Sequence, residues 1–137
     1  MILRPRAVSY LAEAYALAGA IDEGLRLSAE ALTMIEATGE QWDKVELHRI
    51  QGELLRRRPG TDLGECEECF QGALALARRQ GSRGFELRAA SSLARLWRDQ
   101  GKRIEARDLL APIYGWFTEG FDTPDLKEAK ALLDELA

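Results

Sequence analysis

The sequence contains few of the residues on which β-sheets and tight hairpin turns depend. It has 2 valines and 6 isoleucines against 20 alanines and 21 leucines, no asparagine and only 4 prolines. β-Branched residues favour strands and asparagine favours hairpin turns, whereas alanine and leucine are the strongest helix formers. The composition therefore argues against a sheet-rich protein and predicts an all-α fold.

Cysteine and long apolar runs are equally scarce, and positive charge is not in excess. Two cysteines and the lack of any glycosylation sequon indicate a reducing compartment, so we expect a cytoplasmic protein. No apolar run approaches the ~18 residues that a membrane helix requires. The net charge of −4 disfavours a dedicated nucleic-acid binder, which normally carries a basic excess. We therefore expect neither a membrane nor a nucleic acid as the partner.

Helix start and stop signals divide the chain into seven predicted helices. Gly39, Gly81, Gly101 and the pair Pro59-Gly60 are the clearest stops, and the last helix opens at the segment DTPD. The connections are short, so consecutive helices must pack antiparallel. The chain is therefore expected to form a single domain, 1–137, with helix pairs at about 5–38, 41–80 and 83–117 and a capping helix at about 124–136.

Small residues recur at matching places in the three predicted helix pairs. The first helices carry Ala12, Gly52 and Ala94, at spacings of 40 and 42 residues. Small residues at these positions let the two helices of a pair approach closely, and each pair leaves an apolar face that a neighbouring pair can bury. The second helices carry their own small residues at Gly24, Cys66 and Ala106.

This pattern resembles the tetratricopeptide repeat, in a form longer than the usual unit of about 34 residues. Such long-helix repeats are found in the C-terminal portions of large bacterial regulators. The segment ELHRIQGELLRR and the tail GWFTEGFDTPDLKEAKALLDEL are similar to the end of one such group. Its members join an N-terminal nucleotide-cyclase or DNA-binding domain to a signalling ATPase module and a tetratricopeptide tail.

The likeness covers roughly residues 41–137. It implies a right-handed superhelix of three antiparallel hairpins closed by the capping helix, and a role in protein–protein interaction. The 137 residues contain neither the cyclase nor the ATPase module, so the resemblance implies no enzymatic activity.

The segment Cys66-Glu67-Glu68-Cys69 has CxxC spacing but lies inside a predicted helix. A closed zinc site needs four nitrogen or sulfur ligands, and His48 is the only further candidate. A redox CxxC expects a strand–helix–strand setting that this composition does not provide. His48 has no serine or cysteine partner at a recognisable spacing, and no nucleotide-binding or metalloprotease motif occurs. We therefore predict no metal, no cofactor and no catalysis.

Three arginines of the predicted fifth helix share one face, because Arg88, Arg95 and Arg98 stand at i, i+7 and i+10 with Ser91 between them. In tetratricopeptide proteins the first helix of each pair lines the concave groove. The resemblance therefore implies that this face and part of the third helix form a binding groove for acidic groups of a protein or peptide. A solvated face is the alternative. The predicted groove residues are Arg49, Glu53, Arg56, Arg88, Ser91, Arg95 and Arg98.

Four aromatic residues cluster around the end of the sixth helix. We expect the last helix, with Leu126, Leu132, Leu133 and Leu136, to fold back and cover them; the alternative is an exposed self-association patch. The leading predicted function is a protein–protein interaction module of a bacterial signalling or transcription regulator. The alternatives are homo-oligomerisation and sensing of a small-molecule effector in the groove. The aromatic residues are Tyr114, Trp116, Phe117 and Phe121.

Overall fold

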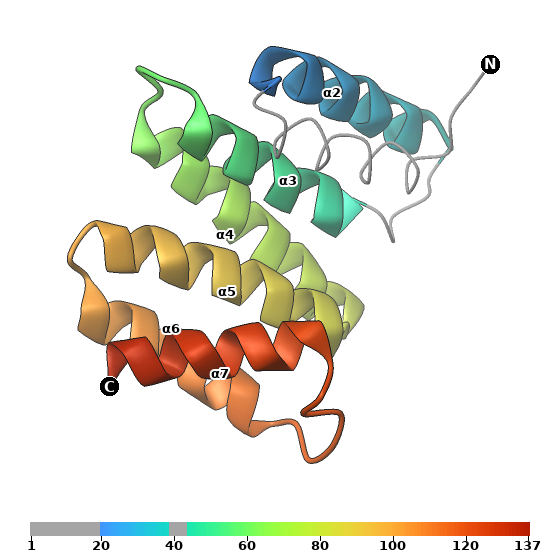
Figure 1. Cartoon of the computed structure of the whole chain (residues 1–137). Helices are drawn as coiled ribbons and strands as arrows, with labels where there is room; N and C mark the ends of the chain where they lie inside the picture. The colour runs from blue at the N-terminus through green and yellow to red at the C-terminus, as the bar shows by residue number, and fades with distance from the viewer. Residues whose placement is uncertain (1–19, 39–43) are drawn as a thin grey trace. The chain divides into compact units, whose positions relative to one another are not determined.

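The computed structural model describes residues 20–38 and 44–137, and the regular structure within these ranges is entirely α-helical (Figure 1). The predicted all-α class is therefore confirmed. The helix expected at about 5–19 lies outside the described residues. The helices within the described ranges all fall short of the length and apolarity that a bilayer crossing requires. They are α2 (Ile21–Thr38), α3 (Lys44–Arg57), α4 (Leu63–Gln80), α5 (Arg83–Asp99), α6 (Arg103–Gly115) and α7 (Pro124–Leu136).

The chain divides into two compact units, Met1–Ala73 (unit 1) and Leu74–Ala137 (unit 2), with the boundary inside α4. Unit 1 therefore holds α2, α3 and the start of α4, and unit 2 holds the end of α4 with α5, α6 and α7. The single domain 1–137 and the superhelical order of the helix pairs stay predictions.

Glycine ends both α4 and α5 in the same way. Gly81 and Gly101 have φ values of +69° and +82°, in the left-handed region that glycine adopts without strain. The N–H of the following residue then donates back to a carbonyl five positions earlier, at 3.0 Å for Ser82 and 2.8 Å for Lys102. These are the bonds of the Schellman motif, so both predicted stops are confirmed.

Helix starts follow the sequence signals less closely. Asp62 and Ser82 cap α4 and α5, since their side-chain oxygens accept backbone N–H groups at 2.9 and 3.4 Å. Pro124 occupies the first turn of α7 as predicted. Thr123 does not cap that helix, however, because its hydroxyl donates instead to the carbonyl of Gly120 at 2.7 Å.

In unit 1, α2 packs against α3 through two apolar groups, one around Ala31 and Leu47 and one around Ile50 and Leu54. Helix α3 also meets the first part of α4 closely at Gly52. A Cβ atom placed on Gly52 would lie 2.5 Å from Cε1 of Phe70, whose ring is fully buried. The close approach predicted for this small residue is therefore confirmed.

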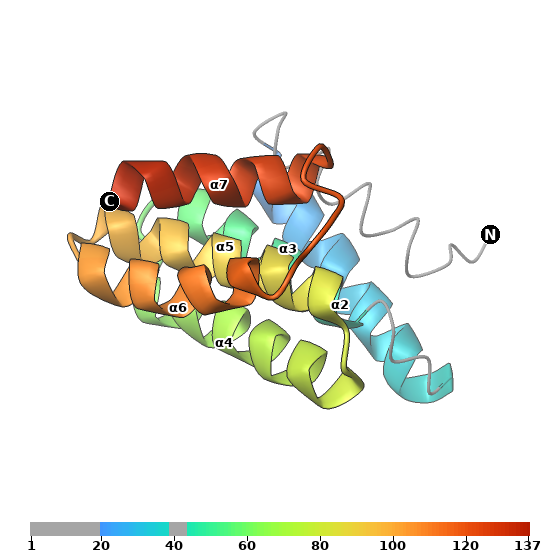
Figure 2. The ribbon, with the colours of Figure 1, turned by 90° about the horizontal axis from the view of Figure 1, so that it is seen from below.

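In unit 2, α5 packs against α6 and also against α7, which returns along both helices (Figure 2). Ala94 on α5 and Ala106 on α6 are fully buried, in agreement with their assignment as packing positions. Leu126, Ala129 and Leu132 of α7 are also buried. Unit 2 is thus a packed group of helices in which α7 supplies one apolar face.

Candidate functional site

The four residues predicted for the fifth helix do share one face of α5, which we call the α5 arginine face (Arg88, Ser91, Arg95 and Arg98). This face is not open, because α7 lies against α5. Each of the three arginines forms an ion pair with an acidic residue of α7. The distances are 3.5 Å from Arg88 Nε to Asp125 Oδ1, 3.3 Å from Arg95 Nη2 to Glu128 Oε2 and 2.9 Å from Arg98 Nη1 to Glu135 Oε2.

Ser91 stands three residues after Arg88 and four before Arg95, so it lies on the same side of the helix. It is 4% exposed, and its hydroxyl has no hydrogen-bond partner in the described part of the chain. A buried hydroxyl without a partner costs about 1–3 kcal/mol. The contact between α5 and α7 therefore leaves one polar group of this face unmatched.

The end of α7 has a further attachment. The guanidinium of Arg103, at the start of α6, donates a hydrogen bond to the backbone carbonyl of Glu135. A cation at this position compensates the unpaired carbonyls and the negative dipole end of α7. Arg98 and Arg103 therefore hold the same helix end from two neighbouring helices.

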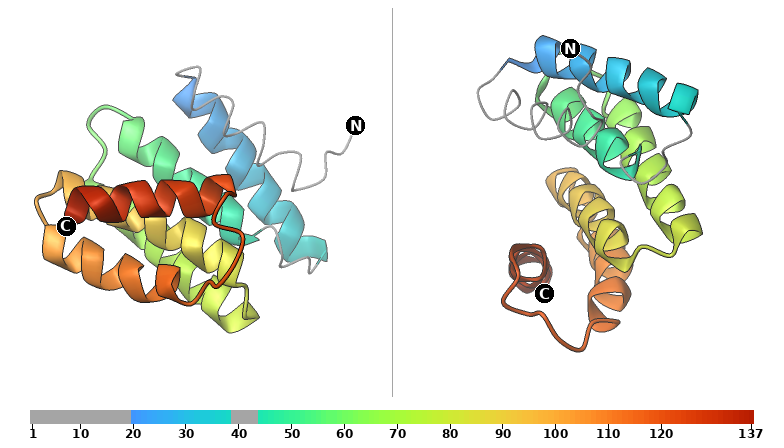
Figure 3. Two further views of the ribbon diagram at one scale, coloured as in Figure 1. Left: turned by 60° about the horizontal axis from the view of Figure 1, so that its bottom comes forward. Right: turned by 90° about the vertical axis from the view of Figure 1, so that its right-hand side faces the viewer.

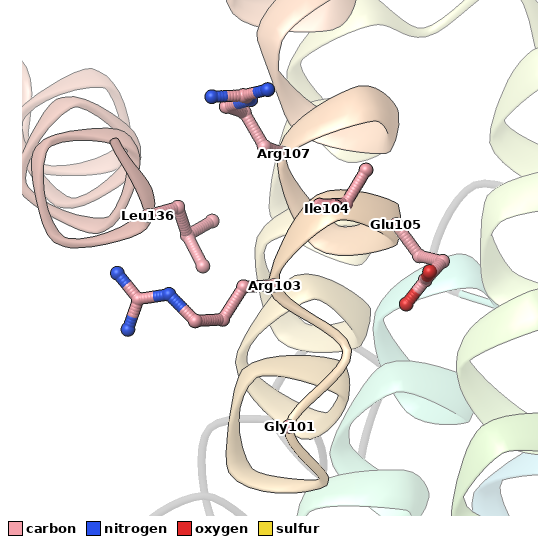
Figure 4. A pocket seen from close by; sticks show the side chains of 6 residues that line it. All are labelled: Gly101, Arg103, Ile104, Glu105, Arg107 and Leu136. Carbon is pink, nitrogen blue, oxygen red and sulfur yellow. The ribbon is translucent and has the colours of Figure 1, made fainter.

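A pocket of about 350 Å³ lies beside this helix end (Figure 4). Arg103 and Arg107 extend on the side of α6 that faces Leu136, whereas Glu105 points away. The pocket is open to solvent, since Ile104 in its lining is 66% exposed. It is lined by Gly101, Arg103, Ile104, Glu105, Arg107 and Leu136.

The other predicted groove residues belong to unit 1 and form ion pairs along their own helix. Arg49 pairs with Glu46 at 2.8 Å, and both side chains are 9% exposed. Arg56 pairs with Glu53 at 2.9 Å. These are i, i+3 pairs on α3. Arg49, Glu53 and Arg56 belong to unit 1 and the α5 arginine face belongs to unit 2, so a groove built from both stays a prediction.

Glu86 is a buried acid that the sequence reasoning missed. Arg78 and Arg83 contact its carboxylate at 3.0 and 3.2 Å, and Arg83 also lies over the Trp116 ring, 4.9 Å from its centroid. The i, i+3 spacing of Arg83 and Glu86 could have indicated their ion pair from the sequence. The pairing with Arg78 crosses the turn between α4 and α5, so no helical periodicity pointed to it.

The prediction that the last helix covers the aromatic cluster is wrong for two of its members. Trp116 is 54% exposed and Phe121 is 46% exposed, although α7 does fold back onto α5 and α6. Helix α7 packs its buried leucines onto α5 and α6 without covering these two rings. Tyr114 and Phe121 still contact each other, with ring centroids 5.8 Å apart.

The CxxC cysteines are both free thiols on one side of α4. Cys66 is buried and Cys69 half-buried. Burial raises the pKa of both thiols, for Cys69 to about 11, and the neighbouring Cys66 adds to the effect on Cys69. Both thiols therefore keep their protons near neutral pH, whereas metal ligation and nucleophilic attack require the thiolate.

His48 is half-buried on α3 and takes part in contacts there. Residues 20–38 and 44–137 contain no group of three or more histidine, cysteine or acidic side chains placed to hold a metal ion.

Comparison of the chain with protein-family models and with curated proteins found no match. The functional interpretation therefore depends on the residues of the chain itself.

Proposed function

We propose that the protein is a non-catalytic interaction module and that the α5 arginine face binds acidic groups of another protein. The observation that carries this proposal is the ladder of three arginines, each already paired with a carboxylate of a packed helix. Arginine pairs with carboxylates in a directional manner, so a row of three selects a segment with acids at matching intervals.

We further propose a tetratricopeptide-like stack of helix pairs within a cytoplasmic bacterial regulator. The sequence resemblance over residues 41–137 supports this relationship. The burial of Gly52, Cys66, Ala94 and Ala106 supports it as well, because small residues at these places are what the repeat uses for close packing.

The test neutralises two of the three α7 acids that pair with the arginines, so that Arg95 and Arg98 become available. We call the full chain with Glu128→Gln and Glu135→Gln the α7-neutral variant. Immobilised α7-neutral protein is exposed to extract of the source cell, and each retained protein is then purified and titrated directly. We expect affinity to fall at least about tenfold when Arg95→Gln and Arg98→Gln are added, and to fall with salt.

The matched control is Arg79→Gln on α4, since Arg79 is exposed and makes no ion pair in the described part of the chain. Arg78 is unsuitable as a control because it contacts the buried carboxylate of Glu86. Equal affinity of the α7-neutral variant with and without the arginine substitutions would show that the α5 arginine face is not the binding surface.

Self-association is the second candidate function, and the exposure of Trp116 and Phe121 favours it. Exposed aromatic residues are enriched at protein interfaces. Sedimentation of the full chain over a wide concentration range tests this function. A rise in mass with concentration that Trp116→Ser with Phe121→Ser abolishes would place self-association ahead of partner binding.

A further inference from the structure

We propose that the partner of the α5 arginine face is an acidic amphipathic helix that takes the place of α7, so that α7 acts as an intramolecular competitor. This inference rests on the proposed function, because it assigns both the partner class and the regulation of the same face.

The chemistry of the partner is defined by α7 itself. Its buried residues recur at helical spacing, at Leu126, Ala129, Leu132 and Leu136, and form one apolar stripe. The acids that pair with α5 flank this stripe, so apolar and acidic contacts are made together. The α5 arginine face therefore already accommodates a helix of this kind, and an acidic helix from another protein presents the same groups.

The ion pairs hold α7 only weakly. The acidic partners Asp125, Glu128 and Glu135 have side chains 45%, 65% and 57% exposed. Pairs so open to solvent are screened by water and salt and contribute little to stability. The Ser91 hydroxyl on the same face of α5 is buried without a hydrogen-bond partner in the described residues, which is a further defect. A partner helix with a polar group opposite Ser91 would complement the face better than α7 does.

The connection between α6 and α7 allows α7 to leave without unwinding its neighbours. Residues 116–123 are not helical, and in Figure 3 this segment loops away from the packed helices. Within unit 2, α7 contacts α5 and α6, which also pack directly against each other. Release of α7 therefore exposes the α5 arginine face while the α5–α6 pair remains in contact.

The experiment uses a labelled synthetic peptide with the sequence of residues 122–137 and full-length protein throughout. The affinity of this peptide is measured for the parent chain and for the α7-neutral variant, in which the attachment of α7 to α5 is weakened. We expect the peptide to bind the α7-neutral variant on the order of tenfold more tightly. The apparent affinity is proportional to the fraction of molecules in which α7 has left the α5 arginine face, and this fraction is larger in the variant. Glu68→Gln with Glu119→Gln, two exposed acids without an ion pair in the described residues, serves as the matched control and should bind like the parent.

Two further comparisons test the class of partner. Adding Arg95→Gln and Arg98→Gln to the α7-neutral variant should weaken binding of the peptide by about tenfold. A peptide with Ala129→Pro keeps every charge but cannot form the helix, so it should fail to bind. Equal binding of the proline peptide would overturn the helical partner in favour of an extended acidic segment.

Native hydrogen exchange of the parent chain measures the opening of α7 without any substitution. Amides of α7 should exchange about tenfold or more faster than buried amides of α5, since a displaceable helix opens locally. Equal protection of α7 and α5 would overturn the competition.

Failure of this inference is distinguishable from failure of the proposed function. Equal peptide affinity for the parent and the α7-neutral variant, with arginine dependence retained, overturns the competitor role and leaves the binding face intact. Captured partners that depend on the arginines, with no peptide binding at all, overturn the helical class alone. Dimers of the parent chain that the peptide dissociates would instead assign the site to α7 of a second copy.

Discussion

Gly52 shows how a single small residue determines the packing of α3 against α4. We expect Gly52→Ala to destabilise the protein by about 1–3 kcal/mol, because the added methyl group overlaps the buried ring of Phe70. Urea unfolding measures this difference. Gly72→Ala is the matched control, since nothing lies within 4 Å of a Cβ atom there. That control should stabilise the protein by roughly 0.5–1 kcal/mol, so destabilisation by both substitutions would contradict the packing argument.

At Ser91, another buried position, substitution by alanine is expected to raise the stability of the protein rather than lower it. Ser91→Ala removes a hydroxyl that has no partner in the described residues, so stability should rise by roughly 0.5–1.5 kcal/mol. Ser28→Ala is the comparison, because the hydroxyl of this equally buried serine donates to the carbonyl of Leu25 at 3.0 Å. Thermal unfolding of both variants tests the difference. A larger loss for Ser91→Ala than for Ser28→Ala would reveal a hydrogen bond to Ser91.

The thiols of α4 yield a prediction about pH. The pKa of Cys69 is raised to about 11 in the folded protein, above the value of about 8.5 for an exposed thiol. The folded state therefore holds this proton more tightly, and its contribution to stability is present below about pH 8.5 and is lost as the pH rises towards 11. Alkylation at increasing pH should report an apparent pKa near 11 for Cys69. An apparent value at or below about 8.5 would contradict the role of burial.

At the scale of helices, the pairing of α5 with α6 depends on two small residues. Ala94 and Ala106 are both fully buried. Either Ala94→Leu or Ala106→Leu should destabilise the protein by about 1–3 kcal/mol through overpacking. Ala131→Leu on the exposed side of α7 should have an effect within about 0.5 kcal/mol. Denaturant midpoints that do not separate these variants would mean that the repeat register is wrong.

Helix boundaries were predictable from the sequence because their signals are local. Gly81 and Gly101 end their helices through their own backbone conformation, and Pro59-Gly60 stands one intervening residue beyond the end of α3. The shared face of Arg88 and Arg95 was predictable for the same reason, since helical periodicity alone defines it.

The occupant of that face was not predictable. Arg95 and Glu128 are 33 residues apart in sequence, and the acids of α7 had no local feature to distinguish them from solvated surface charges. The exposure of Trp116 and Phe121 depends likewise on the direction in which α7 returns. Long-range packing decides both features, and periodicity within one helix carries no information about it.

The whole molecule consists of two compact units, and this division predicts which helices a destabilising substitution affects. Leu132 is buried on α7 within unit 2, so Leu132→Ala should destabilise the protein by about 2–5 kcal/mol. Its neighbour Leu133 is only half-buried, and Leu133→Ala should have a smaller effect. Hydrogen exchange should therefore increase in α5, α6 and α7 much more than in α2 and α3.

Gly52→Ala provides the reciprocal measurement, because its effect arises in unit 1. Exchange should then increase mainly in α2 and α3, and the double variant should lose stability equal to the sum of the two single losses within about 0.5 kcal/mol. In a helical stack each pair is stabilised by its nearest neighbours, so a local response that weakens with distance agrees with such a stack. Uniform acceleration of exchange in all six described helices after either substitution would contradict two units that respond separately. That result would favour a single cooperative domain spanning residues 1–137.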